Sequence, residues 1–179
     1  MIYFITSNDN KFREAKEIFS GHGISIEQIS RPYKEIQADT LEEVVREALE
    51  NIDEEEVFIE DAGLFIEALG GFPGVYSKYV KDTIGNEAIL KLLSDVKERG
   101  AVFQSVVGYK GKNIKVFEGK VEGKIAEEQR GKKGFGYDPI FIPKGFNKTF
   151  AEDISLKMRL SHRKQAMEKL AKYLANKTS

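Results

Sequence analysis

The segment from residue 57 to residue 77, VFIEDAGLFIEALGGFPGVYS, limits the possible folds of this chain more than any other. Its apolar start, residues 57–59, predicts a buried strand, and the adjacent carboxylates Glu60 and Asp61 follow directly. We expect the strand to end there, because a loop rich in glycine and proline comes next. Carboxylates at the carboxyl end of an inner strand lie at the rim of an α/β sheet, where such folds bind ligands. Two neighbouring carboxylates suit a divalent cation or the activation of a water molecule, although two solvated charges are the alternative.

The composition is that of a globular chain. It has 179 residues, of which 41% are hydrophobic, enough for one domain with a sizeable core, which we expect to fold as two lobes over residues 1–179. The net charge of -1 and the lack of a basic tail argue against a nucleic-acid partner. Cysteine is absent, which excludes disulfides and thiolate metal sites. No apolar run is long enough to span a membrane, so we expect a cytoplasmic protein without a membrane partner.

The N-terminal residues predict a strand, a polar loop and a helix in succession. Residues 2–5 are apolar, and an apolar stripe of helical spacing begins at Phe12. The loop between them reads Thr6-Ser7-Asn8-Asp9-Asn10-Lys11. The first N–H groups of such a helix attract anions, Lys11 adds a full positive charge, and Ser7 and Asn8 add neutral donors. The alternative is an Asn or Asp helix cap beside a solvated lysine.

The rest of the chain adds helices and an antiparallel extension of the sheet. Residues 24–29 predict a second strand, and Thr40 with Glu43 predicts a capping box at the start of a helix. Glu35 lies in the connection before that helix, from which it could reach the rim of the sheet. Further elements are expected at residues 76–93 (a helix interrupted near Gly85), 102–109 and 114–121 (a hairpin) and 140–142 (a strand), and residues 156–174 include the last helix.

Two more segments carry side chains suited to a nucleotide base. Phe135 stands between two glycines and is a candidate platform on which a base stacks, with an aromatic plug in an ordinary turn as the alternative. His162 and Arg163, at the start of the last helix, offer adjacent donors, although a histidine there is often structural. An anion-binding loop, an acidic rim, an aromatic loop and a His-Arg pair together describe a nucleotide site.

Six blocks, in order over nearly the whole chain, resemble the inosine triphosphate pyrophosphatase family, the non-canonical purine nucleoside triphosphate pyrophosphatases. The blocks are Thr6-Ser7-Asn8-Asp9-Asn10-Lys11, Glu60-Asp61-Ala62-Gly63-Leu64, Gly71-Phe72-Pro73-Gly74-Val75-Tyr76-Ser77, Gly134-Phe135-Gly136-Tyr137-Asp138-Pro139-Ile140-Phe141, Thr149-Phe150-Ala151-Glu152 and Ser161-His162-Arg163. The resemblance implies an α/β fold with an elongated mixed β-sheet flanked by helices, in two lobes with a central nucleotide cleft. It also implies a homodimer and the Mg²⁺-dependent hydrolysis of ITP, dITP and XTP to the monophosphate and pyrophosphate.

The resemblance also implies the roles of individual residues. Asp61 would be the general base that activates the attacking water, and Glu35, Glu60 and Asp61 would bind the metal. The implied substrate contacts are Thr6, Ser7, Asn8, Lys11, Ala62, Phe135, Gly136, Tyr137, Asp138, Lys157, His162 and Arg163. Among these, the triphosphate contacts are Ser7, Asn8, Lys11 and Lys157, the stacking ring is Phe135, and the purine edge is read by Asp138, His162 and Arg163.

The chain departs from the family at the acidic rim, and other functions remain open. Many members have two aspartates where this chain has Glu60-Asp61, and a serine or threonine where it has Ala62. Donors from His162 and Arg163 would suit a 6-oxo purine and would pair badly with adenine. The alternatives are a pyrophosphatase for modified pyrimidine triphosphates and a catalytically inactive nucleotide-binding regulatory protein. Cleavage between the α and β phosphates rests on the resemblance alone.

Overall fold

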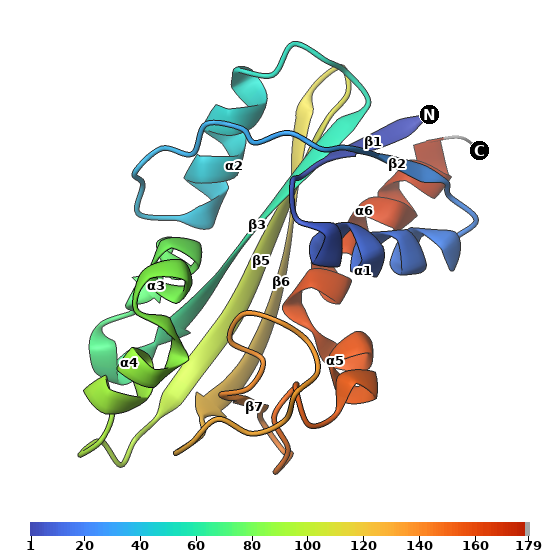
Figure 1. Ribbon diagram of the computed structural model, residues 1–179. Helices are drawn as coiled ribbons and strands as arrows, with labels where there is room; N and C mark the ends of the chain where they lie inside the picture. The colour runs from blue at the N-terminus through green and yellow to red at the C-terminus, as the bar shows by residue number, and fades with distance from the viewer. Residues whose placement is uncertain (178–179) are drawn as a thin grey trace. The chain divides into compact units, whose positions relative to one another are not determined.

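A computed structural model describes residues 1–177 as the mixed α/β fold that the sequence predicts (Figure 1). Its elements are, in order, β1 (Ile2–Ile5), α1 (Asp9–Ser20), β2 (Ile26–Ile29), α2 (Leu41–Glu50), β3 (Val57–Ile66), the 3-10 turn η1 (Glu67–Leu69), β4 (Pro73–Gly74), α3 (Ser77–Thr83), α4 (Gly85–Leu92), β5 (Gly100–Lys110), β6 (Ile114–Ile125), β7 (Phe141–Pro143), α5 (Ile154–Leu160) and α6 (His162–Lys177). The strands pair in the order β2-β1-β3-β5-β6-β7, and β4 pairs with β3. None of the helices within the described residues has the length and apolar character needed to cross a membrane.

The chain divides into two compact units, and the first contains Met1–Asp61, Ser105–Gly119 and the residues from His162 onward. In it, β1 pairs in parallel with both β2 and β3, and Phe4 lies opposite Phe58. The rings of Phe4 and Phe58 stack with centroids 4.5 Å apart, and Phe19 of α1 packs on Phe58 at 5.2 Å. Apolar residues of α6, such as Met167, join the same core. Burial of these aromatic rings fixes α1 and α6 against the sheet.

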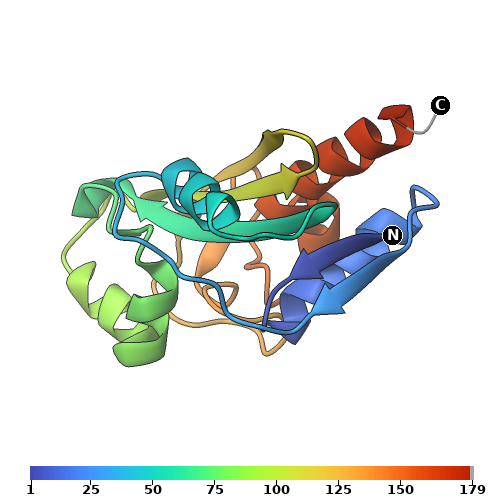
Figure 2. The same ribbon diagram turned by 90° about the horizontal axis from the view of Figure 1, so that it is seen from above.

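Helices cover both faces of the sheet in this first unit (Figure 2). Val107 of β5 belongs to the core that includes α1 and α6. A Cβ on the next residue, Gly108, would come within 2.3 Å of Val45 and 2.6 Å of Leu49, which are both buried residues of α2. Neighbouring residues of a strand point to opposite faces, so α2 lies on the face opposite α1 and α6. Only glycine allows α2 this close to β5.

The second unit contains Ala62–Gln104 and Lys120–Ser161. Here β3 pairs antiparallel with β4, and β6 pairs antiparallel with β7. Its core is built around Phe141, whose ring meets Phe103 with centroids 5.2 Å apart and Phe150 at 5.3 Å. This unit therefore has an aromatic core of its own, independent of the stack around Phe58.

Most expected elements are confirmed, and one boundary was wrong. The interruption at Gly85, the hairpin of β5 and β6 and the capping box at Thr40 are all present. However, β3 does not end at Glu60-Asp61 but continues to Ile66, because Leu64 and Phe65 pair with β4. The last helix, expected within residues 156–174 with His162 and Arg163 near its start, is confirmed as α6, and a separate short helix, α5, precedes it. Ser161 has a ψ of 151°, an extended conformation that ends α5 and lets α6 begin at His162.

Candidate active site

The polar loop between β1 and α1 uses its own side chains to start the helix. The Asn8 side-chain oxygen accepts hydrogen bonds from the main-chain N–H groups of Asn10 (3.0 Å) and Lys11 (3.1 Å), and therefore caps α1. Thr6 Oγ1 in turn accepts from the N–H of Asn8 at 3.1 Å. The predicted helix cap is confirmed, whereas the solvated lysine that went with it is not. Lys11 Nζ lies 2.9 Å from Glu60 Oε2 and donates to the Glu60 main-chain oxygen at 3.0 Å.

Glu60 is buried in the middle of β3 and is surrounded by cations and donors of the first unit. Its side chain forms ion pairs with Lys11 and with Arg163 Nε, the latter at 3.2 Å, and accepts a hydrogen bond from Ser105 Oγ at 2.6 Å. Burial alone would raise the pKa of Glu60, but the charges of Arg163 and Lys11 outweigh burial and hold the pKa well below its usual value. Glu60 is therefore a permanent anion at the centre of this unit.

Asp61 and Glu35 both carry charges that add to the effect of burial in raising the pKa of a different residue, Tyr33. Because Asp61 follows Glu60 in a strand, its side chain points to the other face of the sheet. The Tyr33 hydroxyl donates to the Glu60 main-chain oxygen at 3.2 Å. Burial raises the pKa of Tyr33 well above its usual value, and the charges of Asp61, Glu35 and Glu60 raise it further. Tyr33 thus stays protonated beside partly buried Asp61 and exposed Glu35.

The carboxylates of residues 1–177 do not come together as a ready-made metal cage. No group of three or more His, Asp or Glu side chains within those residues is arranged to hold a metal ion. Asp61 and Glu35 nevertheless supply the hard oxygen atoms that Mg²⁺ prefers. Mg²⁺ is commonly held by one or two carboxylates together with water and substrate phosphates. This part of the chain therefore fits Mg²⁺ bound with a phosphate ligand.

Buried side chains hold the aromatic loop of the second unit, residues 134–138, in place. Asp138 Oδ2 accepts hydrogen bonds from the N–H of Phe135 at 2.8 Å and from Lys157 Nζ at 2.7 Å, and Asp138 and Lys157 are both buried. Lys157 Nζ also lies 4.2 Å from the centroid of the Phe135 ring, within the range of a cation–π interaction. Gly134 has a φ of +74°, and a Cβ there would come within 2.3 Å of Asp138 Oδ2. The ring of Phe135 is thus fixed by one buried ion pair.

Two blocks that were singled out in the sequence, and one residue that was not, brace this loop from within the second unit. The Tyr137 hydroxyl donates to the Ser77 main-chain oxygen at 2.7 Å, which connects the loop to the Gly71–Ser77 block. The N–H of Ala151 donates to the Asp138 main-chain oxygen at 3.2 Å, which connects it to the Thr149–Glu152 block. Asn86 of α4, which the sequence did not suggest, donates to the Gly136 main-chain oxygen at 3.1 Å. These separate blocks therefore form one scaffold.

His162 and Arg163 open α6 in the first unit, and both are buried. Besides its ion pair with Glu60, Arg163 has Nη1 at 2.6 Å from Glu14 Oε2, on α1. The guanidinium is therefore held between two carboxylates. The sequence predicted adjacent donors here, with a structural histidine as the alternative, and the structure shows that both side chains are buried.

The comparison with known proteins settles the family. The model of the Ham1 family matches residues 2–173. The chain belongs to the Ham1 family. It is 50% identical over 182 residues to the dITP/XTP pyrophosphatase of Methanopyrus kandleri, covering 98% of this chain and 96% of the relative. It is also 50% identical over 179 residues to the dITP/XTP pyrophosphatase of Pyrococcus horikoshii, covering 97% and 96%.

Solved structures agree with this assignment. The Ham1 protein of Staphylococcus aureus matches with a TM-score of 0.80 and 30% identity, over 98% of this chain and 99% of that protein. A Ham1 protein from Coxiella burnetii matches with a TM-score of 0.79 and 30% identity, over 98% and 100%. The resemblance drawn from the six blocks is thereby confirmed, and the mixed α/β fold is that of the Ham1 proteins.

The Ham1 chain groups its predicted site residues into two sets. Lys11, Glu60 and Arg163 meet in the first unit, and Phe135, Asp138 and Lys157 meet in the second. Ala62 is partly buried at the start of the second unit's share of β3, and Ser7 is exposed. The sequence reasoning missed Glu14, Tyr33, Ser105 and Asn86. Ser105 carried a usable signal, because it is a small polar residue within the apolar run of β5.

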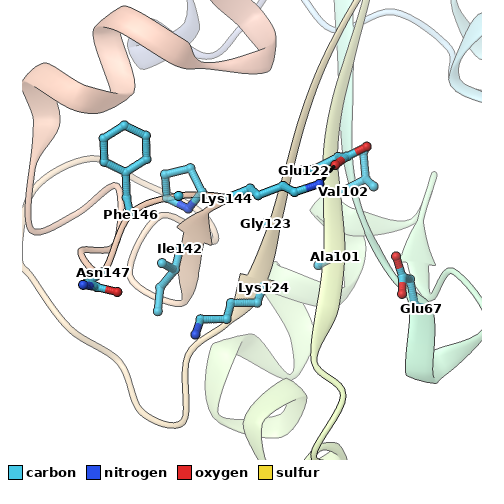
Figure 3. A pocket seen from close by; sticks show the side chains of 12 residues that line it. Glu67, Ala101, Val102, Glu122, Gly123, Lys124, Ile142, Lys144, Phe146 and Asn147 are labelled. Carbon is cyan, nitrogen blue, oxygen red and sulfur yellow. Dashed lines mark hydrogen bonds and ion pairs between the residues drawn. The ribbon is translucent and has the colours of Figure 1, made fainter.

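A separate pocket of about 600 Å³ lies in the second unit, and Figure 3 shows its lining. Side chains of β6, β7 and the turn after β7 surround it, among them Lys124, Ile142 and Phe146. Lys144 and Glu122 form an exposed ion pair there, with Nζ and Oε2 2.9 Å apart. The residues described as lining this pocket include none of the predicted site residues, so it is no part of the candidate active site.

Proposed function

We propose that this Ham1-family chain hydrolyses non-canonical purine nucleoside triphosphates, namely ITP, dITP and XTP, to the monophosphate and pyrophosphate. The observation that carries the proposal is the nearly full-length match, at 50% identity, to relatives named dITP/XTP pyrophosphatases. Those names favour a catalytically active enzyme over an inactive nucleotide-binding regulator, and a purine substrate over a modified pyrimidine. In the cell, such an enzyme would remove these nucleotides from the nucleotide pool.

Asp61 is proposed as the general base. The oxygen of a water molecule attacks the α-phosphorus, the bond between that phosphorus and the α–β bridging oxygen breaks, and pyrophosphate leaves. The proton from the water passes to Asp61 and then to solvent. Asp61 suits this task because it is only partly buried, whereas its neighbour Glu60 is enclosed by cations. A carboxylate of this kind works mostly by orienting the water.

Glu35 and Asp61 are proposed as the Mg²⁺ ligands. Burial raises the pKa of Tyr33 and the charges of both carboxylates raise it further, so both lie in the surroundings of its hydroxyl. When bound, Mg²⁺ would neutralise charge that develops on the phosphate oxygens. Glu60 was expected to be a third ligand, and that expectation stays a prediction. The oxygen atoms of Glu60 already lie against Lys11, Arg163 and Ser105.

The remaining site residues are proposed to bind the two ends of the nucleotide. The triphosphate would be contacted by Thr6, Ser7, Asn8, Lys11, Ala62 and Lys157, and the purine by Phe135, Gly136, Tyr137, Asp138, His162 and Arg163. The fixed ring of Phe135 supports stacking, since a base gains about 1–3 kcal/mol on an aromatic platform. Donors from His162 and Arg163 would favour a 6-oxo purine over adenine. A homodimer, a cytoplasmic location and a domain of two lobes complete the proposal.

The test is to identify the products formed from ITP and from ATP in the presence of Mg²⁺, by chromatography. We expect IMP and pyrophosphate from ITP, little turnover of ATP, and a loss of at least about a hundredfold in Asp61→Asn, the range in which general bases contribute. Asp53→Asn changes an exposed aspartate of the same unit and should behave like the wild type. IDP and phosphate as products, or full activity in Asp61→Asn, would contradict the proposal.

A further inference from the structure

One carboxylate in the first unit connects three segments that are far apart in the sequence. Glu60 of β3 lies 2.9 Å from Lys11 Nζ on α1 and 3.2 Å from Arg163 Nε on α6, and it accepts a hydrogen bond from Ser105 of β5. The side chain of Glu60 is fully buried. Lys11 is the proposed contact of the phosphates and Arg163 that of the purine, so the two cations serve opposite ends of the nucleotide.

We propose that Glu60 is a positioning residue that fixes Lys11 and Arg163 relative to one another, so that a phosphate contact and a purine contact are set by one buried anion. This inference rests on the proposed function, because it uses the roles proposed there for the two cations. It assigns Glu60 a task other than metal binding. The selectivity of the enzyme for 6-oxo purines then depends on a residue that does not itself contact the base.

The oxygen atoms of Glu60 support positioning over metal binding. Oε1 takes the ion pair with Arg163 and the hydrogen bond from Ser105, and Oε2 takes the ion pair with Lys11. The main-chain oxygen accepts from both Lys11 and Tyr33. A Mg²⁺ ion at this carboxylate would have to displace at least one cation from a site that water does not reach.

The same contacts explain why the position of the cations depends on Glu60. Two like charges packed around one buried group repel each other once its negative charge is removed. Each cation keeps a second anchor, because Arg163 also pairs with Glu14 at 2.6 Å and Lys11 also donates to the Glu60 main-chain oxygen at 3.0 Å. The variant Glu60→Gln should therefore fold, with both cations less precisely placed.

The first test compares kcat/KM for ITP and for ATP in wild type, Glu60→Gln and Glu60→Asp, each titrated with Mg²⁺. We expect the ITP-to-ATP ratio to fall about tenfold in Glu60→Gln, which is the usual size of a coupling between residues in contact. Glu60→Asp keeps the charge and should recover most of the ratio. The Mg²⁺ concentration for half-maximal activity should change in Glu35→Gln but not in Glu60→Gln.

The second test is a double-mutant cycle of Lys11→Met and Arg163→Met, measured as kcat/KM for ITP. The two losses should be non-additive by about tenfold when Glu60 is present and additive in the Glu60→Gln background. The matched control is Glu56→Gln, which breaks another ion pair of the first unit, with Lys177 at 3.1 Å, and should leave the ITP-to-ATP ratio unchanged.

Each outcome decides the matter. A shifted Mg²⁺ requirement in Glu60→Gln, an unchanged ITP-to-ATP ratio, or a cycle that is additive with Glu60 present would overturn the inference. If Glu60→Gln does not fold, the cycle in the wild type still decides it. A wild-type enzyme that does not prefer ITP to ATP would instead refute the proposed function, and the two failures are thereby distinguished.

Discussion

Two buried carboxylates of this chain, Glu60 and Asp138, are each packed against a buried or half-buried cation. Glu60 has Lys11 and Arg163, and Asp138 has Lys157. Removing a charge from water costs several kcal/mol, and only a close counter-charge with further hydrogen bonds offsets that cost. Natural chains have no need of such pairs for stability alone, since apolar residues would serve as well. Their presence next to proposed substrate-binding residues is best explained by the fixed geometry that they impose.

At the scale of single residues, the ion pair of Asp138 and Lys157 leads to a prediction about stability. Asp138→Asn leaves Lys157 as an uncompensated buried cation, so we expect the free energy of unfolding to fall by about 3–5 kcal/mol. Asp138→Asn combined with Lys157→Met removes both charges and should regain most of that loss. Urea unfolding of the wild type, both single variants and the double variant measures the difference.

Stability and binding should separate in the same series. In the wild type, Lys157 Nζ lies 4.2 Å from the centroid of the Phe135 ring. The double variant should keep the fold but has no cation beneath this ring. We therefore expect KM for ITP to stay raised although stability returns. A double variant as unstable as Asp138→Asn would show that the cost does not come from the unpaired charge.

At the scale of single elements, α2 begins with a complete capping box. Thr40 Oγ1 accepts from the N–H of Glu43 at 3.2 Å, and the Glu43 carboxylate accepts from the N–H of Thr40 at 3.0 Å. Thr40→Ala removes the hydrogen bond from the N–H of Glu43 to the Thr40 hydroxyl, and we expect it to lower the free energy of unfolding by about 1 kcal/mol. Thr40→Ser keeps the hydroxyl and should stay within a few tenths of the wild type. ITP hydrolysis should be unchanged in both; equal stabilities for Ala and Ser would argue against the cap.

The elements show how far the sequence alone could lead. Helix caps, the break at Gly85 and the hairpin were predictable because they depend on neighbouring residues. The continuation of β3 past Asp61 was not, because it depends on pairing with β4, which local pattern does not reveal. The alternation of Leu64 and Ile66 was the available signal. Likewise, the neighbouring Glu60 and Asp61 suggested one chelating pair, whereas a strand points them to opposite faces.

At the scale of the whole molecule, each unit contains a tyrosine that must stay protonated, half-buried Tyr33 in the first and buried Tyr137 in the second. Burial raises the pKa of Tyr137 in the second unit above its usual value, and the charge of Asp82 raises it further. Burial likewise raises the pKa of Tyr33 in the first unit. A free tyrosine has a pKa of about 10. In the folded chain both hydroxyls therefore hold their protons at pH values where the unfolded chain has released them.

This difference predicts how stability changes with alkaline pH. Because the folded pKa lies above the unfolded one, the contribution of each tyrosine is fully present below about pH 10 and is lost as the pH rises from there. The free energy of unfolding, measured with urea between pH 8 and pH 11, should therefore fall steeply above about pH 10. Tyr137→Phe should lose about 1 kcal/mol at pH 8, because the hydrogen bond to Ser77 is gone, and should then fall less steeply. Tyr79→Phe, a change at a ring that is 71% exposed, should follow the wild type, and an equal slope in Tyr137→Phe would mean that Tyr137 does not control alkaline unfolding.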